Sequence, residues 1–144
     1  MGVSRRKLAA FSVAILAGLG TAGCVGLSNA TSVPIQRSTS ISIAELPADM
    51  RPIRIVLLSD IHVGNLAMRP ERLTEIVRQV NGAKPDIILL AGDFIIGESE
   101  AGAAKRALDL APLSGLRAPD GVFAVLGNHD HWTDPKAIRR SLAD

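Results

Sequence analysis

The sequence is poor in the residues that build disulfide scaffolds, thiolate metal sites and aromatic binding surfaces. Its 144 residues include a single cysteine, Cys24, so neither an intrachain disulfide nor a cysteine-based zinc site is available. Aromatic residues make up 3% of the chain, with no tyrosine and one tryptophan. This scarcity argues against a stacking surface for single-stranded nucleic acid. The length is that of one domain at most.

Signatures of nucleotide and nucleic-acid binding are also missing. Neither a Gly-rich loop ending in Lys-Ser/Thr nor a GxGxxG pattern follows the first predicted strand, which argues against a nucleotide-binding switch protein. The net charge of +2 depends on Arg5, Arg6 and Lys7 at the start of the chain. Removing these three from the 16 basic residues leaves 13 against 14 acidic ones. No basic surface therefore remains to bind a nucleic-acid backbone.

Residues 1–30 are typical of a targeting segment, because they contain no acidic residue and begin with a basic cluster. An uncharged run rich in Ala and Gly follows, from Leu8 to about Leu27, as in a signal peptide. The run is about long enough to span a bilayer, so this segment is predicted to be a signal peptide or a membrane anchor. The pair Arg5-Arg6 resembles a twin-arginine export signal. The rest of the chain is then expected on the extracytoplasmic face of a bacterial membrane.

Two cleavage sites fit this leader. Small residues at Ser28-Asn29-Ala30 have the spacing of a signal-peptidase site. The segment Thr21-Ala22-Gly23-Cys24 resembles a lipoprotein box, although a role for Cys24 as a small apolar residue is slightly favoured over lipidation. Residues 31–50 are predicted to be a linker, with Ile41-Ser42-Ile43 as a short edge strand.

Three short apolar runs alternate with helical patterns in the remainder of the chain. Buried strands are predicted at residues 53–58, 87–90 and 122–126. Helices are predicted from Pro70 to Asn81-Gly82, from about 99 to 110 with Pro112 as the stop, and from Asp134-Pro135 onward. This order, βαβαβ followed by a helix, predicts an α/β fold with a parallel sheet.

Polar side chains follow each of the three predicted strands. Asp60 and His62 come after the first strand, Asp93 after the second, and Asn128, His129 and Asp130 after the third. The carboxyl ends of parallel strands lie along one edge of a sheet, where open α/β sheets bind ligands. If the extended geometry of the first strand persists, Asp60 and His62 also point the same way. The sequence therefore predicts that these groups meet at one rim.

Carboxylate, imidazole and amide donors together suit Mn, Fe or Zn better than Ca. An aspartate on the middle strand can bridge two such ions, as in binuclear hydrolases. Each residue alone also has a structural explanation. Asp60 could cap a loop, Asp93 follows a glycine as turn residues do, and Asn128 after Gly127 is a common left-handed turn residue. The ligand interpretation depends on all three clusters occurring together.

The three clusters resemble the first three signature blocks of the calcineurin-like metallophosphoesterases. The blocks are Ser59-Asp60-Ile61-His62, Gly92-Asp93 and Gly127-Asn128-His129-Asp130, and the similarity covers roughly residues 46–143. It is greatest to the exported bacterial branch that includes UDP-2,3-diacylglucosamine hydrolases. The resemblance implies that residues 51–144 form the βαβαβ amino-terminal half of a four-layer α/β/β/α sandwich. It also implies metal-dependent hydrolysis of a phosphoester, with a lipid-linked substrate among the candidates.

The resemblance assigns metal ligands as well. Asp60 and His62 would hold a first divalent ion of the Mn, Fe or Zn type. Asp93 would bridge it to a second ion, which Asn128 would bind through its side-chain oxygen.

Catalytic roles are implied for the residues that follow Asn128. His129 would contact the phosphate or protonate the leaving group, and Asp130 would hydrogen-bond His129 and set its tautomer. His131 and Trp132 are expected to pack in the loop or to line the substrate, without a catalytic role.

The chain departs from the family pattern in its histidines. The family adds a Gly-His block and a Gly-His-x-His block from a second half, whereas the three histidines here end at His131. We therefore expect an amino-terminal fragment of a phosphoesterase, with one sheet face exposing apolar surface. The alternative is a complete, non-catalytic module that binds metal or a partner and is attached to the membrane by its N-terminal segment.

Overall fold

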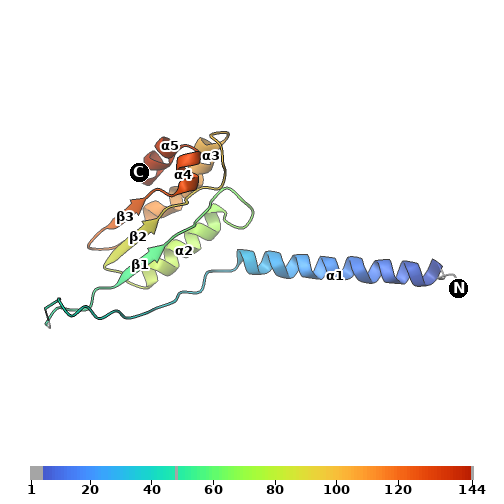
Figure 1. Cartoon of the computed structure of the whole chain (residues 1–144), viewed down its shortest axis with the longest axis horizontal. Coiled ribbons are helices and arrows are strands. Elements are labelled where there is room, and N and C mark those ends of the chain that lie inside the picture. The colour runs from blue at the N-terminus through green and yellow to red at the C-terminus, as the bar shows by residue number, and fades with distance from the viewer. Residues whose placement is uncertain (1–4, 48, 144) are drawn as a thin grey trace. The chain divides into compact units, whose positions relative to one another are not determined.

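The structure is a computed structural model that describes residues 5–47 and 49–143. The chain divides into two compact units, one ending at Ser32 and the other beginning at Val33. Helix α1 (Arg5–Thr31) makes up the first unit, and the sheet with its covering helices belongs to the second (Figure 1).

Helix α1 covers the predicted targeting segment and ends at Thr31, where the linker was expected to have begun. The sequence led us to expect an apolar run about long enough for a bilayer. Among the described residues, however, no helix has both the length and the apolar character that crossing a membrane requires.

The predicted edge strand at residues 41–43 is wrong. These residues form no regular structure, and Ile41 and Ile43 are exposed. An alternation over three residues is too short to form a strand unless a neighbour pairs with it. Among the described residues, this segment makes one local backbone hydrogen bond, from the Leu46 N–H to the Ile43 carbonyl at 3.3 Å.

The predicted parallel sheet is confirmed. Its strands lie in chain order, and each pairs in parallel with the next. Leu89 in the middle strand pairs with Leu57 on one side and Phe123 on the other. The strands are β1 (Ile55–Leu58), β2 (Ile87–Ala91) and β3 (Val122–Val125).

The helices agree with the sequence prediction in part. The expected first and last helices are present, and the first buries Leu73, Ile76, Val77 and Val80 at helical spacing. The helix expected at 99–110 is shorter, because Gly102 adopts the left-handed φ of 70° just before it, and the chain continues as a 3₁₀-helix through Pro112. A short helix replaces the expected loop at 128–132. The bounds are α2 (Pro70–Gly82), α3 (Ala103–Ala107), η1 (Leu108–Gly115), α4 (Asn128–Trp132) and α5 (Pro135–Ala143).

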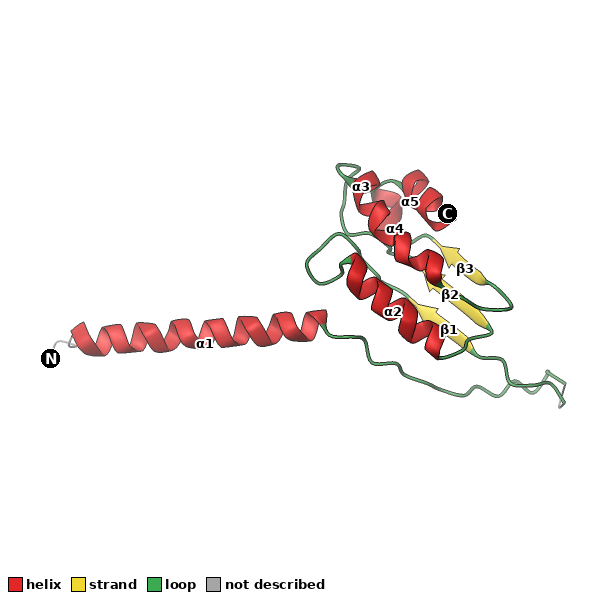
Figure 2. Cartoon of the chain, turned by 180° about the vertical axis from the view of Figure 1, so that it is seen from behind, coloured by secondary structure: helices red, strands yellow, loops and turns green. Residues whose placement is uncertain are grey.

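The helices of the second unit gather on one face of the sheet (Figures 1 and 2). On that face Ile88 and Leu90 are buried, and the core continues through Phe94 and Ile95 beyond the end of β2. On the opposite face the sequence predicts exposed apolar surface, and within the described part of the second unit Leu57, Phe123 and Val125 are each more than half exposed there. The rim beyond the strands is therefore anchored to the core from one side.

Asp86 joins the amino-terminal ends of all three strands. Its backbone N–H donates to the Arg54 carbonyl at 2.8 Å, and its carbonyl accepts the Asp120 N–H at 2.9 Å. Its carboxylate accepts the Arg54 N–H at 2.7 Å and the Arg51 guanidinium at 2.8 Å. The Arg54 N–H, followed by the Arg51 guanidinium, holds the pKa of the Asp86 carboxyl below its ordinary value of 3.8.

We predict that Asp86→Asn lowers the urea midpoint at pH 7. A carboxyl whose pKa is lowered by folding stabilises the protein above its unfolded pKa, and this stabilisation is lost as the pH falls through the folded value. The midpoint difference between wild type and variant should thus be full at pH 7 and shrink once the pH drops below about 4. Equal midpoints at pH 7, or a difference that grows in acid, would contradict this role. Asp49→Asn, at an exposed linker position, is the matched control.

Candidate metal centre

Backbone hydrogen bonds join the loops after β1 and β2 into a short ladder. The Asp60 N–H donates to the Gly92 carbonyl at 3.3 Å, and the His62 N–H to the Asp93 carbonyl at 2.9 Å. One residue further, the Val63 N–H donates to the Phe94 carbonyl at 2.8 Å. The backbones beneath Asp60, His62 and Asp93 are consequently fixed relative to one another.

Fully buried residues alternate with the polar ones along these loops. Val63 follows His62, and Phe94 and Ile95 follow Asp93, each with no exposed surface. The apolar residues anchor the loops in the core, so the polar side chains are presented on a rigid support.

The extended geometry assumed for Asp60 and His62 is wrong. Strand β1 ends at Leu58, and both residues adopt left-handed backbone conformations, with φ of 54° and 50°. Asp93 has the same conformation, with φ of 54°. Asp and His are among the non-glycine residues that tolerate this region best, and such conformations cluster at functional sites. Asp60 and His62 still meet, because the left-handed turns bring them together instead of strand alternation.

The loop after β3 lies directly against Asp93. A Cβ atom at Gly92 would lie 2.5 Å from the Gly127 nitrogen, and one at Gly127 would overlap the Asp93 carboxylate. The His129 N–H donates to Asp93 Oδ1 at 3.0 Å. Two glycines thus allow the third strand end to reach the other two, and the contact orients the Asp93 side chain.

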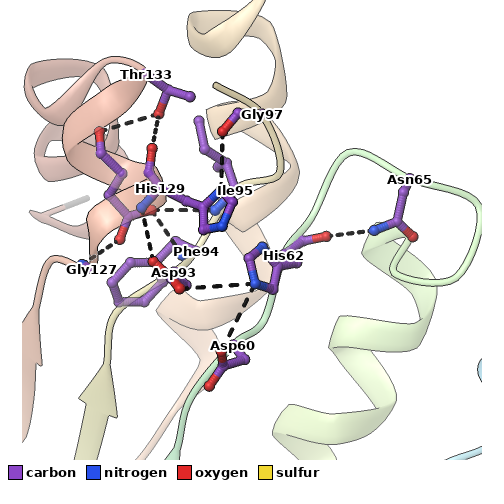
Figure 3. A network of polar contacts seen from close by, with 11 residues as sticks. Asp60, His62, Asn65, Asp93, Phe94, Ile95, Gly97, Gly127, His129 and Thr133 are labelled. Carbon is purple, nitrogen blue, oxygen red and sulfur yellow. Dashed lines mark hydrogen bonds and ion pairs between the residues drawn. The ribbon is translucent and has the colours of Figure 1, made fainter. Parts of the chain in front are cut away.

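His62, Asp93 and His129 form one cluster in which their candidate ligand atoms all lie within 4.8 Å of one another (Figure 3). His62 Nε2 lies 4.0 Å from Asp93 Oδ2 and 3.9 Å from Asp60 Oδ1. These gaps are too long for hydrogen bonds. Two ligands each about 2.1 Å from one metal lie roughly 3.0–3.4 Å apart in octahedral or tetrahedral geometry, so a bound ion would draw these donors slightly closer together. The donor set of imidazoles and carboxylates fits a divalent ion of the expected type.

The hydrogen bonds around His129 identify its free nitrogen. Its Nδ1 lies 3.1 Å from the Gly97 carbonyl oxygen, and a carbonyl can only accept (Figure 3). Nδ1 therefore carries the proton, which leaves Nε2 for a ligand. The His129 ring also packs edge-on against His62 and Trp132, with ring centroids 5.0 Å apart in each case.

The buried Nδ1 of His62 has no hydrogen-bond partner among the described residues. The contact with the His129 ring holds its imidazole edge-on, and its Nε2 faces the carboxylates. It is the imidazole nitrogen Nε2 facing two carboxylate oxygens, and not the buried Nδ1, that supports a site for a cation.

Asp130 does not make the hydrogen bond to His129 that we expected. Its side chain is fully buried, Oδ1 accepts the Phe94 N–H at 2.8 Å and the Ile95 N–H at 3.4 Å, and Oδ2 accepts the Gly127 N–H at 2.8 Å. The Asp130 carboxylate thus ties the loop after β2 to the loop after β3. The Gly97 carbonyl, and not Asp130, accepts the hydrogen bond from His129. Because this acceptor is a backbone group, no pattern of side chains in the sequence could have identified it.

The remaining predicted ligands lie at the edge of the cluster. The Asp60 side chain is 68% exposed and reaches the cluster through its approach to His62. Asn128 is exposed at the first position of α4, directly before His129. The structure thus brings together His62, Asp93 and His129, with Asp60 approaching His62, while Asn128 adjoins the cluster only through its position before His129 in the chain.

Comparison with known proteins agrees with the resemblance drawn from the sequence blocks. A family model described as calcineurin-like phosphoesterase matches residues 53–143. A Bos taurus "transmembrane protein with metallophosphoesterase domain" is 39% identical over 93 residues, which are 65% of this chain and 20% of that protein. The UDP-2,3-diacylglucosamine pyrophosphatase LpxG of Chlamydia muridarum is 36% identical over 86 residues, 60% of this chain and 25% of that protein. No solved structure gives a significant match.

These relatives come from animals as well as bacteria, and a Bacillus subtilis protein, the uncharacterized metallophosphoesterase YkoQ, is 36% identical over 95 residues. That alignment covers 66% of this chain and 33% of YkoQ. The chain therefore spans between a fifth and a third of the length of the relatives described.

We predict that Asp130→Asn lowers the free energy of unfolding by about 1–3 kcal/mol, the cost of a buried group left without its hydrogen bond. The asparagine amide would place a donor against a backbone N–H that now donates to the carboxylate. Urea unfolding of the variant, with Asp49→Asn as control, measures this loss. An Asp130→Asn variant as stable as wild type would show that the carboxylate does not tie these loops.

Proposed function

Because the chain belongs to the calcineurin-like phosphoesterase family, whose model matches residues 53–143, we propose that it hydrolyses a phosphoester bond at the rim of its sheet. The observation that carries the proposal is the convergence of His62, Asp93 and His129 from three separate strand ends. Divalent ions bound there would supply the positive charge that lowers the pKa of a water molecule and stabilises the phosphate oxygens.

His62 and Asp93 would hold the first ion, with Asp60 completing its ligands from the exposed side. Asp93 has an oxygen available for this role, because Oδ1 accepts the His129 N–H while Oδ2 faces His62 Nε2. We infer that a second ion would be held by Asp93 together with Asn128, which is exposed and directly precedes His129. Together these residues would make the binuclear arrangement.

His129 would act on the phosphate through Nε2. Its Nδ1 proton is held by the Gly97 carbonyl, so the ring is oriented by a backbone group, as histidines in metal sites commonly are. In the protonated ring, Nε2 can donate a hydrogen bond to a phosphate oxygen or a proton to the leaving group. Asp130 would contribute by keeping the loops after β2 and β3 in register.

The substrate class proposed is a phosphodiester or a diphosphate, lipid-linked substrates included. One relative is named a UDP-2,3-diacylglucosamine pyrophosphatase, a name that describes a diphosphate bond on a lipid-bearing sugar. The alternative is a chain that binds metal without turnover. It is favoured by the exposed positions of Asp60 and Asn128, which leave the ligand set open on the solvent side.

We predict Mn²⁺-dependent hydrolysis of bis(p-nitrophenyl) phosphate by the purified chain. Asp93→Asn should lower kcat/KM by at least about a hundredfold, since the loss of groups that merely support metal ligands already costs roughly 10–100-fold. Asp49→Asn should leave the rate unchanged. Metal content after dialysis, measured on the same samples, should fall in Asp93→Asn alone.

The outcomes separate the two functions. If the wild-type chain binds Mn²⁺ but shows no turnover, the proposed hydrolysis is overturned and the metal-binding alternative is supported. Turnover that Asp93→Asn does not reduce would overturn the proposed site.

A further inference from the structure

Arg106, in the short helix α3, lies against the loop after β1, which carries His62, and against the loop after β2, which carries Asp93. Its aliphatic stem packs against Gly64, two residues after His62. A Cβ atom at Gly64 would lie 2.5 Å from Arg106 Cδ and 2.9 Å from Cγ. Gly64 also adopts a positive φ of 100°, which disfavours any side chain at this position. The loop after β1 thus rests directly on the arginine stem.

The guanidinium of Arg106 lies against the loop after β2. A Cβ atom at Gly97 would lie 2.9 Å from Nη2, and one at Gly102 would lie 3.2 Å from Nη1. Nη1 donates to the Ala101 carbonyl at 2.9 Å, so residues 97–102 surround the arginine head. Arg106 Nε is buried without a hydrogen-bond partner, and no carboxylate forms an ion pair with Arg106 in the described part of the chain.

Gly97 connects this arginine to His129. The carbonyl that holds the His129 Nδ1 proton belongs to Gly97, which has a φ of 136°. The methyl group of Thr133 lies near the same position, since a Cβ atom at Gly97 would lie 3.4 Å from it. The Thr133 hydroxyl in turn donates to the His129 carbonyl at 2.9 Å. Gly97 is therefore close both to Arg106 and to Thr133, the residue that follows the helix carrying His129.

We propose that Arg106 is a positioning residue for the metal centre. Its guanidinium fixes the Gly97 carbonyl against His129, so that the imidazole keeps its proton on Nδ1 and presents Nε2 to the rim. Its stem at the same time supports the loop that carries His62. The catalytic consequence rests on the proposed function, whereas the orientation of His129 is a property of the chain itself.

The test replaces Arg106 by methionine, whose unbranched side chain retains the packing against Gly64 but cannot donate to Ala101. Arg78→Met is the matched control, because the Arg78 side chain is exposed on α2 and paired with Glu75. Long-range ¹H–¹⁵N correlation of the imidazoles at alkaline pH reports which nitrogen of His129 carries the proton. We expect the Nδ1–H form in wild type and Arg78→Met, and a mixture with the Nε2–H form in Arg106→Met.

The substitution Arg106→Met is expected to affect kcat and not KM. Arg106→Met should lower kcat by roughly tenfold, a part of the 10²–10⁴-fold that general acid–base groups contribute, with little change in KM. Arg106→Lys keeps the charge and a donor for Ala101, and should restore most of the Nδ1–H form. A change confined to stability, with the tautomer and kcat equal to those of Arg78→Met, would overturn the proposal.

The other possible outcomes of these experiments also test the proposal. If wild type shows no turnover, the proposed function fails for this chain while the tautomer spectra still test Arg106. If Arg106→Met does not fold, Arg106→Gln, which also lacks the guanidinium, takes its place in both measurements. An Nδ1–H form and a kcat equal to those of Arg78→Met would then overturn the proposal.

Discussion

The site depends on a single residue that joins three strand ends. The Asp93 carbonyl accepts the His62 N–H, and its Oδ1 accepts the His129 N–H. The third loop can come this close only because Gly92 and Gly127 carry no side chain at their contact. The remaining carboxylate oxygen, Oδ2, is then directed to His62 Nε2. The carboxylate of Asp93, the candidate metal ligand, is thus oriented by the same contacts that fix the sheet edge, as a rigid scaffold preorganises a site before a ligand arrives.

The sequence predicts those features of the fold and the site that follow from the spacing of apolar residues or from the position of a residue after a strand. Apolar runs predicted the three strands, and the buried face of α2 showed in Leu73, Ile76, Val77 and Val80. The position of Asp93 and of the histidines after the runs predicted one rim, because parallel strands end together. These inferences needed no knowledge of side-chain geometry.

The parts that the sequence did not predict arise from the backbone. The left-handed conformations of Asp60 and His62 leave no trace in a pattern of residue types, so an extended chain was assumed. Asp130 was expected to hydrogen-bond His129. Instead its buried carboxylate accepts hydrogen bonds from three backbone N–H groups. The group that does orient His129, the Gly97 carbonyl, belongs to a residue without a side chain. Tertiary contacts, not residue chemistry, decided each of these.

The central claim is that this rim is a metal centre, and crystals of the chain soaked in Mn²⁺ would test it most directly. Anomalous diffraction at the manganese edge should show a peak about 2.0–2.3 Å from His62 Nε2 and Asp93 Oδ2, the usual range for such ligands. A well-ordered rim without a peak there, in crystals that bind manganese elsewhere on the chain, would contradict the account.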